Sequence, residues 1–276
     1  MDIGMGYAAV LGIIQGLTEF LPVSSSGHLV LFQNLLGLTE PEIFFDVSLH
    51  VGTLIALCVF FFEDLKGIAT TLFSVSTWSG QEDTLWKRLR QKPEMRLLGL
   101  ILLGTVPTAF LGLVFRPMAE KLFSSVQIVG SMLLVTGLLL WLTRGLKREG
   151  RHVGQLMIWD ALLIGTIQGL AILPGISRSG ATIAMGLFRG LSRETAVRYS
   201  FLLSIPAILG AMLLELGGAL TSGFPPAGVV LLGTFMAAAV GFAALKILIH
   251  LVKKGNLYAF APYCWLLGIL AIVGSF

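Results

Sequence analysis

The chain has 276 residues, of which 55% are hydrophobic and 12% are charged, whereas an ordinary soluble domain carries roughly 25% charged residues. This composition excludes a soluble globular enzyme, a disordered chain and a nucleic-acid binder. The two cysteines, Cys58 and Cys264, lie alone inside apolar stretches, which excludes a disulfide scaffold. The sequence therefore predicts an all-α polytopic membrane protein, whose small excess of basic residues reports topology before it reports partners.

The first predicted element is a re-entrant helical hairpin over residues 3–40. Its first arm has no Lys or Arg ahead of it and no small-residue cleavage site, so it is not a signal peptide. Pro22 then breaks the helix, and a second apolar helix begins after the polar turn 24–27. A polar, non-helical turn at membrane depth is tolerated only where protein surrounds it or where it lines a wet cavity. The segment is therefore predicted to enter the bilayer and return.

Three membrane spans are predicted next, over residues 44–62, 97–115 and 126–143, each near the length of about 20 apolar residues that a bilayer requires. The loop before the second span holds six Lys or Arg residues, and the predicted linker 144–156 holds four. Only Arg116 and Lys121 lie on the intervening side. The positive-inside rule then places the two basic loops in the cytoplasm.

A second hairpin is predicted over residues 157–192, because Gln168-Gly169-Leu170 repeats Gln15-Gly16-Leu17 after 153 residues and is again followed by a Pro break and a Ser/Gly-rich turn. The remaining predicted spans cover residues 199–214, 227–245 and 257–276.

Each half of the chain, 1–143 and 157–276, thus holds one hairpin and three spans. Because three is odd, the second half must be inserted upside down, with the first hairpin entering from outside and the second from the cytoplasm. In such inverted repeats the site lies where the broken helices meet. The turn 24–28 is therefore expected to face the turn 177–182.

Two ionisable side chains inside the hairpins indicate a functional site. Gln15 and Glu19 are four residues apart and share a helix face, and Arg178 is the one basic residue in either hairpin core. Ionisable groups inside a membrane are functional candidates by default. The alternative is a purely structural Glu19–Arg178 pair that holds the two halves together.

Clustered hydroxyls beside these charges are typical of phosphate binding. Serines and glycines at helix N-termini offer hydroxyls and backbone N–H groups to an anion, and a guanidinium adds a bidentate donor. N-capping alone is the simpler interpretation of any one serine. The candidate substrate-binding residues are Gln15, Ser24, Ser26, Gly27, Ser177, Ser179 and Thr182.

Histidines near the turns carry two interpretations each. His28 follows Ser25 by three positions, so general acid or base work and a structural role are both open. Asp46 and His50 form an i, i+4 pair that we interpret as a cavity wall or supporting layer, with catalysis as the lesser alternative. Asp160 is expected to lie at the membrane interface.

The stretches Gln15–His28 and Pro174–Thr182, together with Phe45–Thr53, resemble the signature motifs of the undecaprenyl-diphosphate phosphatase family, also called the bacitracin-resistance family. The resemblance covers nearly the whole chain. It implies an integral hydrolase of the bacterial plasma (inner) membrane, with its active site open to the outer face. The implied reaction removes the terminal phosphate of undecaprenyl diphosphate and regenerates the lipid carrier for peptidoglycan synthesis.

The resemblance also implies roles for individual residues. The family's (Glu/Gln)-x-x-x-Glu motif falls on Gln15 and Glu19, its histidine on His28, its candidate nucleophile on Ser25 and its phosphate-binding arginine on Arg178. A divalent cation, Mg²⁺ or Ca²⁺, is implied as cofactor, with Glu19 as its expected ligand.

Two mechanisms and a rival function remain open from the sequence. Ser25 is expected to attack the terminal phosphorus with help from His28 or Glu19, and water activated by Glu19 is the variant. The rival is a polyprenyl-phosphate transporter or flippase that uses the same inverted-repeat site. A homodimer is compatible with the sequence, which does not determine the oligomeric state.

Overall fold

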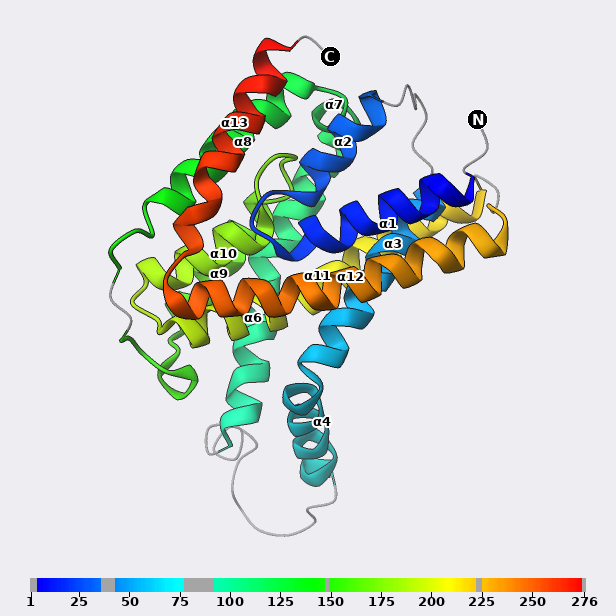
Figure 1. The fold of residues 1–276 in the computed structure, drawn as a ribbon. Coiled ribbons are helices and arrows are strands. Elements are labelled where there is room, and N and C mark those ends of the chain that lie inside the picture. The colour runs from blue at the N-terminus through cyan, green and yellow to red at the C-terminus, as the bar shows by residue number, and fades with distance from the viewer. Residues whose placement is uncertain (1–3, 36–42, 77–91, 147–148, 222–224, 275–276) are drawn as a thin grey trace.

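A computed structural model describes residues 4–35, 43–76, 92–146, 149–221 and 225–274. The regular secondary structure of the described part is helical, as predicted, and the described residues form no β-strand, only one isolated bridge between Arg151 and Leu191. The helices are α1 Met5–Phe20, α2 Ser25–Leu35, α3 Ile43–Phe60, α4 Phe62–Ser76, α6 Pro93–Phe115, α7 Ala119–Phe123, α8 Val126–Trp141, α9 Ile158–Leu170, α10 Arg178–Phe188, α11 Arg193–Thr221, α12 Ala227–Lys254 and α13 Ala261–Val273, with 3-10 turns η1 Arg116–Met118, η2 Val153–Gln155 and η3 Leu257–Phe260 (Figure 1).

Three described stretches are long and apolar enough to cross a bilayer, namely Pro93–Met118, Arg193–Leu214 and Ala227–Lys254. A fourth crossing is formed if α3 and α4 count as one broken span, because the two helices meet at a bend of 76°. These apolar helices make the chain a multi-pass membrane protein.

The helices differ in length from the predicted spans. α11 and α12 run beyond the windows 199–214 and 227–245, because a hydropathy window stops at charged residues such as Arg198 and Lys246 while the helix continues. In the windows 126–143 and 257–276 the apolar helices are shorter, over Val126–Trp141 and Leu257–Val273. A helix of the length of α8 rises roughly 24 Å, less than the ~30 Å hydrocarbon core.

The bend after α3 places a helix where the sequence predicted a cytoplasmic loop. α4 covers residues up to Ser76, and the remainder of that loop, residues 77–91, lies outside the described residues. The outermost residues of the first predicted hairpin, 3 and 36–40, also lie outside them.

Both predicted hairpins consist of two helices separated by a short break. α1 ends at Phe20 and α2 begins at Ser25, while α9 ends at Leu170 and α10 begins at Arg178. Ser24 has a left-handed backbone with φ of 69°, which is unusual for a residue other than glycine. Such strain is of order 1–3 kcal/mol and concentrates at functional sites.

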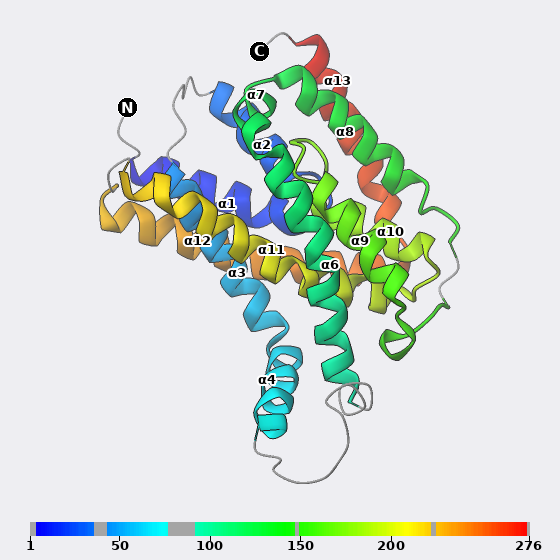
Figure 2. The same cartoon turned by 180° about the vertical axis from the view of Figure 1, so that it is seen from behind.

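Close helix contacts through glycine hold the hairpins against the long helices. α1 packs along α12, and α9 packs along α6 (Figures 1 and 2). A Cβ atom on Gly16 would lie 2.8 Å from both Ala237 O and Gly241 N of α12. The hairpins are therefore fixed in place by backbone-to-backbone packing, as is common between membrane helices.

Candidate active site

The breaks of the two hairpins meet at the centre of the helical assembly (Figure 1). Across the contact, the backbone N–H of Gly175 donates to Ser24 Oγ over 3.1 Å. A Cβ atom on Gly180 would lie 2.9 Å from Cβ of Pro22, so the two backbones approach closely. The prediction that the two turns face each other is confirmed.

Glu19, the one acidic residue of α1, accepts hydrogen bonds from three side chains. Arg178 Nη2 lies 2.6 Å from Oε1, and Ser25 Oγ donates to Oε2 over 2.7 Å. Gln15 Nε2 also donates to Oε2, at 3.0 Å. Residues from α1, α2 and α10 thus join a carboxylate, a guanidinium and a hydroxyl in one cluster, which we call the Glu19 cluster.

Arg178 keeps one donor group for a ligand. Its Nη1 is buried and has no hydrogen-bond partner among the described residues. Arg178 is the first residue of α10, at the end where the helix dipole is positive. A buried cationic donor without a partner at a helix N-terminus fits an anion such as phosphate.

The two serine-rich turns share one local hydrogen-bond pattern. Ser24 Oγ accepts from Gly27 N at 3.2 Å and lies 3.3 Å from Ser26 Oγ. In the second turn, Ser177 Oγ accepts from Gly180 N at 3.1 Å and lies 3.2 Å from Ser179 Oγ. Ser24 and Ser177 therefore cap α2 and α10, the role that the sequence left open for single serines.

Thr182, a candidate substrate-binding residue, directs its hydroxyl to the backbone of its own helix. Its Oγ1 donates to Arg178 O at 2.8 Å. The hydroxyl supports the first turn of α10, which carries Arg178.

His28 is buried beside the Glu19 cluster, with both ring nitrogens engaged. Nδ1 lies 2.8 Å from Ser24 O, and Nε2 lies 2.6 Å from the hydroxyl of Tyr263 in α13. Because a carbonyl oxygen only accepts, Nδ1 carries the proton, and Nε2 accepts from Tyr263. This geometry ties His28 to the strained backbone of Ser24, while Ser25 turns to Glu19.

Two further side chains lie at the site. The sequence analysis did not identify Tyr263, and it placed His50 further from the site. His50 Nδ1 lies 3.0 Å from Gln15 Nε2 and 3.8 Å from Glu19 Oε2. The i, i+4 spacing of Asp46 and His50 predicted that both residues line a cavity wall. The contact with Gln15 instead places His50 next to the Glu19 cluster. No pattern in the sequence marked Tyr263.

The described residues include no group of three His, Cys, Asp or Glu side chains that could hold a metal ion. At the Glu19 cluster, one carboxylate and the nearby His50 are the available ligands of this kind. This donor set fits Mg²⁺ in one binding mode. In that mode one carboxylate binds the ion, and substrate phosphates and water provide the other ligands.

Asp160 is fully buried inside the protein. Arg151 Nη1 and Arg189 Nε lie 2.6 and 2.9 Å from its two carboxylate oxygens, and Met157 N also donates to it. The hydrogen bonds that Arg151 donates to Asp160 raise the pKa of the Arg151 guanidinium. The carboxylate fastens the linker and the end of α10 to the start of α9, because two arginines neutralise it.

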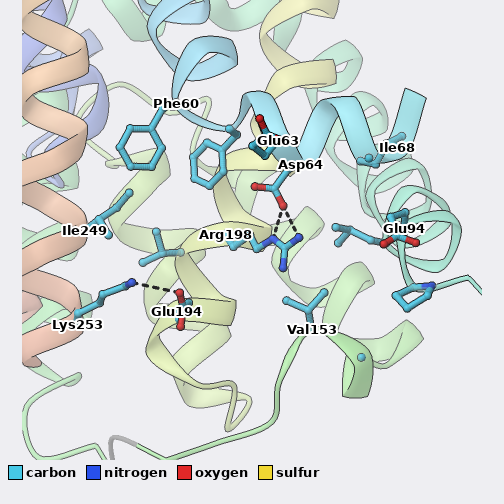
Figure 3. A pocket seen from close by; sticks show the side chains of 16 residues that line it. Phe60, Glu63, Asp64, Ile68, Glu94, Val153, Glu194, Arg198, Ile249 and Lys253 are labelled. Atoms are coloured by element: carbon cyan, nitrogen blue, oxygen red, sulfur yellow. Dashed lines mark hydrogen bonds and ion pairs between the residues drawn. The ribbon is translucent and has the colours of Figure 1, made fainter. Parts of the chain in front are cut away.

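A cavity of about 590 Å³ lies apart from the Glu19 cluster, between α4, α6, α11 and α12 (Figure 3). Its wall includes the pairs Asp64–Arg198 and Glu194–Lys253, with Nζ of Lys253 3.1 Å from Glu194 Oε1. None of the candidate site residues lines it.

Comparisons with known proteins agree with the motifs. The family model described as bacitracin resistance protein BacA matches residues 8–270. The chain is 51% identical over 267 residues to an undecaprenyl-diphosphatase of Desulforapulum autotrophicum and 49% identical over 279 residues to one of Desulfatibacillum aliphaticivorans, with 97% of both chains covered in each case. It is 52% identical over 261 residues to an undecaprenyl-diphosphatase of Desulfosudis oleivorans, with 94% of both chains covered. With this coverage, and with the two motifs joined at one site, the chain belongs to the bacitracin resistance protein BacA family.

Proposed function

We propose that this chain is an integral membrane phosphatase that hydrolyses undecaprenyl diphosphate to undecaprenyl phosphate and inorganic phosphate. The product is the lipid carrier used for peptidoglycan synthesis. The relatives reported above bear the name of this activity and match the chain over nearly its full length.

One structural observation carries the proposal. Glu19 accepts from Ser25 Oγ and from Arg178 at the same time, so a base, a nucleophile and a phosphate-binding cation lie within hydrogen-bond distance of one another. Phosphoryl transfer depends mainly on positioning and on neutralising the charge of the equatorial oxygens. The Glu19 cluster supplies both.

In the proposed mechanism, Ser25 Oγ attacks the terminal phosphorus in line while its proton passes to Glu19 Oε2. The bond from this phosphorus to the bridging oxygen breaks, and undecaprenyl phosphate leaves as Glu19 returns the proton to the departing phosphate. Water then hydrolyses the phosphoserine and restores Ser25. Arg178 Nη1 is the donor available to the transferred phosphoryl group.

We propose Glu19, and not His28, as the proton acceptor for Ser25. The Ser25–Glu19 hydrogen bond at 2.7 Å supports this assignment, as does the engagement of both His28 nitrogens elsewhere. His28 would then hold the turn in shape. Gln15 would orient Glu19, and the capping hydroxyls would fix the N-termini that face the substrate.

The cofactor in this proposal is a divalent cation, Mg²⁺ or Ca²⁺, held by Glu19 and by diphosphate oxygens. When bound, the ion would neutralise phosphate charge. We expect a chelator to abolish phosphate release and a titration with Mg²⁺ or Ca²⁺ to restore it. Undiminished turnover after exhaustive chelation would remove the ion from the proposal.

We further propose that the fold is an inverted repeat of residues 1–143 and 157–276 joined by the linker 144–156. Matching contacts support it, since α1 packs on α12 as α9 packs on α6, and α8 packs on α13. Gly12 meets Gly233 of α12, and 153 positions later Gly165 meets Gly104 of α6. The matching caps of Ser24 and Ser177 support it too.

The test of the proposed activity is phosphate release from undecaprenyl diphosphate by the purified protein in detergent. We expect release by the wild type and its loss in Glu19→Ala, with retention of the folded, monodisperse protein checked by gel filtration. Absence of release by the wild type in the presence of Mg²⁺ and Ca²⁺ would overturn the proposal. Movement of the polyprenyl phosphate across sealed vesicles without phosphate release would instead indicate the transporter.

A further inference from the structure

Gln15 is fully buried, and its amide nitrogen lies between two acceptors. Nε2 is 3.0 Å from Glu19 Oε2 and 3.0 Å from His50 Nδ1. The other end of the amide, Oε1, is buried without a hydrogen-bond partner in the described part of the chain. The orientation of this amide is therefore decided by Glu19 and His50 alone.

The two acceptors together permit one orientation. An ionised carboxylate only accepts, so Glu19 must face the NH₂ group, which has two hydrogens to donate. His50 Nδ1 takes the second hydrogen and so acts as an acceptor. With the amide reversed, Oε1 would lie against the Glu19 carboxylate, and two acceptors would face each other at 3.0 Å.

We infer that His50 is a positioning residue that acts on Glu19 through Gln15, an inference that rests on the proposed phosphatase activity. His50 occupies the second amide hydrogen, Gln15 then keeps its first hydrogen on Glu19 Oε2, and Glu19 stays turned toward Ser25. Without the acceptor on His50, a buried N–H loses its partner and the amide is free to rotate. Glu19 then loses a donor that fixes its direction.

The backbone that carries His50 is held firmly. Thr53 Oγ1 donates to His50 O at 3.0 Å. Nearby, α3 packs on α12 so closely that a Cβ atom on Gly52 would overlap Thr234 O. The imidazole can thus act as a fixed support for the amide.

The experiment is a double-mutant cycle on residues 15 and 50, read as kcat and KM of phosphate release in detergent. His50→Leu removes the acceptor and is expected to lower kcat about tenfold, with KM changed less than about twofold, because a displaced base slows chemistry more than binding. In a Gln15→Met background, His50→Leu should give no further loss, since the residue through which it acts is gone.

Two variants complete the design. His50→Asn places an amide oxygen near the position of Nδ1 and should keep kcat within about threefold of the wild type. Ser48→Ala, on the same helix with its hydroxyl bonded to Phe45 O, touches neither Gln15 nor Glu19 and should retain wild-type kinetics.

The inference is overturned if the two losses in the cycle add, if His50→Leu retains the wild-type kcat, or if His50→Asn is as slow as His50→Leu. Those results would leave the phosphatase assignment standing, because the wild type would still release phosphate. A wild-type protein without phosphate release would instead overturn the proposed function, and the inference with it.

Discussion

At the scale of single residues, the buried pair of Arg178 and Glu19 governs both stability and chemistry. Their side chains are 17% and 6% exposed, and Nη2 lies 2.6 Å from Oε1. Breaking a buried pair by removing one partner destabilises a protein by about 3–5 kcal/mol, because a charge is left without compensation. A substitution that keeps the charge at this pair therefore complements Glu19→Ala, because it disturbs folding less.

Arg178→Lys is such a substitution. We expect at least a 100-fold fall in kcat/KM, because lysine replaces a planar fork by a single nitrogen, which cannot replace two terminal nitrogens directed separately at Glu19 and at phosphate. Expression and thermal stability in detergent should fall far less. Near-normal turnover in purified Arg178→Lys would contradict the role of Arg178 as phosphate clamp.

Ser25→Ala tests the nucleophile. We expect phosphate release to fall by more than about 100-fold, since the hydroxyl that attacks phosphorus is absent. Brief reaction of the wild type with labelled substrate, followed by acid quench and mass spectrometry, should reveal phosphoserine at residue 25. Substantial hydrolysis by Ser25→Ala would favour water activated by Glu19.

At the scale of elements, the hairpins are positioned by close backbone contacts between helices at glycine residues. Gly12 and Gly16 form one face of α1, and a Cβ atom on either would collide with the backbone of α12. Glu19 lies on the turn that follows. A change in the packing of α1 would therefore move the carboxylate relative to Arg178.

Gly16→Ala should show this effect. We expect a loss of about 1–3 kcal/mol in stability from overpacking and a fall in kcat that exceeds any change in KM. Gly99→Ala in α6 is the matched control, because its added Cβ would have no heavy atom within 4 Å beyond its chain neighbours and the adjacent backbone of its own helix, and helix propensity favours the change. Equal melting temperatures and rates for the two variants would show that the close contact of Gly16 with α12 determines neither stability nor activity.

Much of this arrangement was predictable from the sequence. The Pro breaks, the repeated Gln-Gly-Leu and the single arginine predicted that two turns meet around Glu19 and Arg178, because a membrane leaves few other places for polar backbone. The partners of His28 and Gln15 were not predictable, since Tyr263 lies 235 residues and His50 lies 35 residues away in sequence. Sequence periodicity predicts which face of a helix a residue occupies. It does not predict which side chain of a distant helix contacts that residue.

At the scale of the whole molecule, the distribution of basic residues supports one orientation in the membrane. Exposed basic residues lie at the ends of α6, α8 and α12 that the positive-inside rule assigns to the cytoplasm, as Arg96, Arg144 and Lys253 illustrate. Arg116 and Lys121 lie toward the opposite ends. We propose on this basis that α7 faces the outer side of the plasma membrane.

Cysteine labelling of intact cells tests the orientation. Ser124 and Lys254 are both exposed, and they follow α7 and end α12 respectively. We expect a membrane-impermeant maleimide to label Ser124→Cys in intact cells and to label Lys254→Cys only after the cells are lysed. Buried Cys264 and half-buried Cys58 make the parent chain a suitable background. The reverse labelling pattern would invert the topology.

The distance along the chain between Glu19 and Arg178 has a consequence for biosynthesis. The ribosome must add a further 159 residues after Glu19 before its counter-charge exists, which takes roughly 10 to 30 s at ordinary elongation rates. Throughout that interval the nascent first hairpin holds a carboxylate without its counter-charge, which is costly in lipid. The translocon, or the wet surface of the bilayer, must therefore shelter this segment until the later half of the polypeptide emerges and draws it inward.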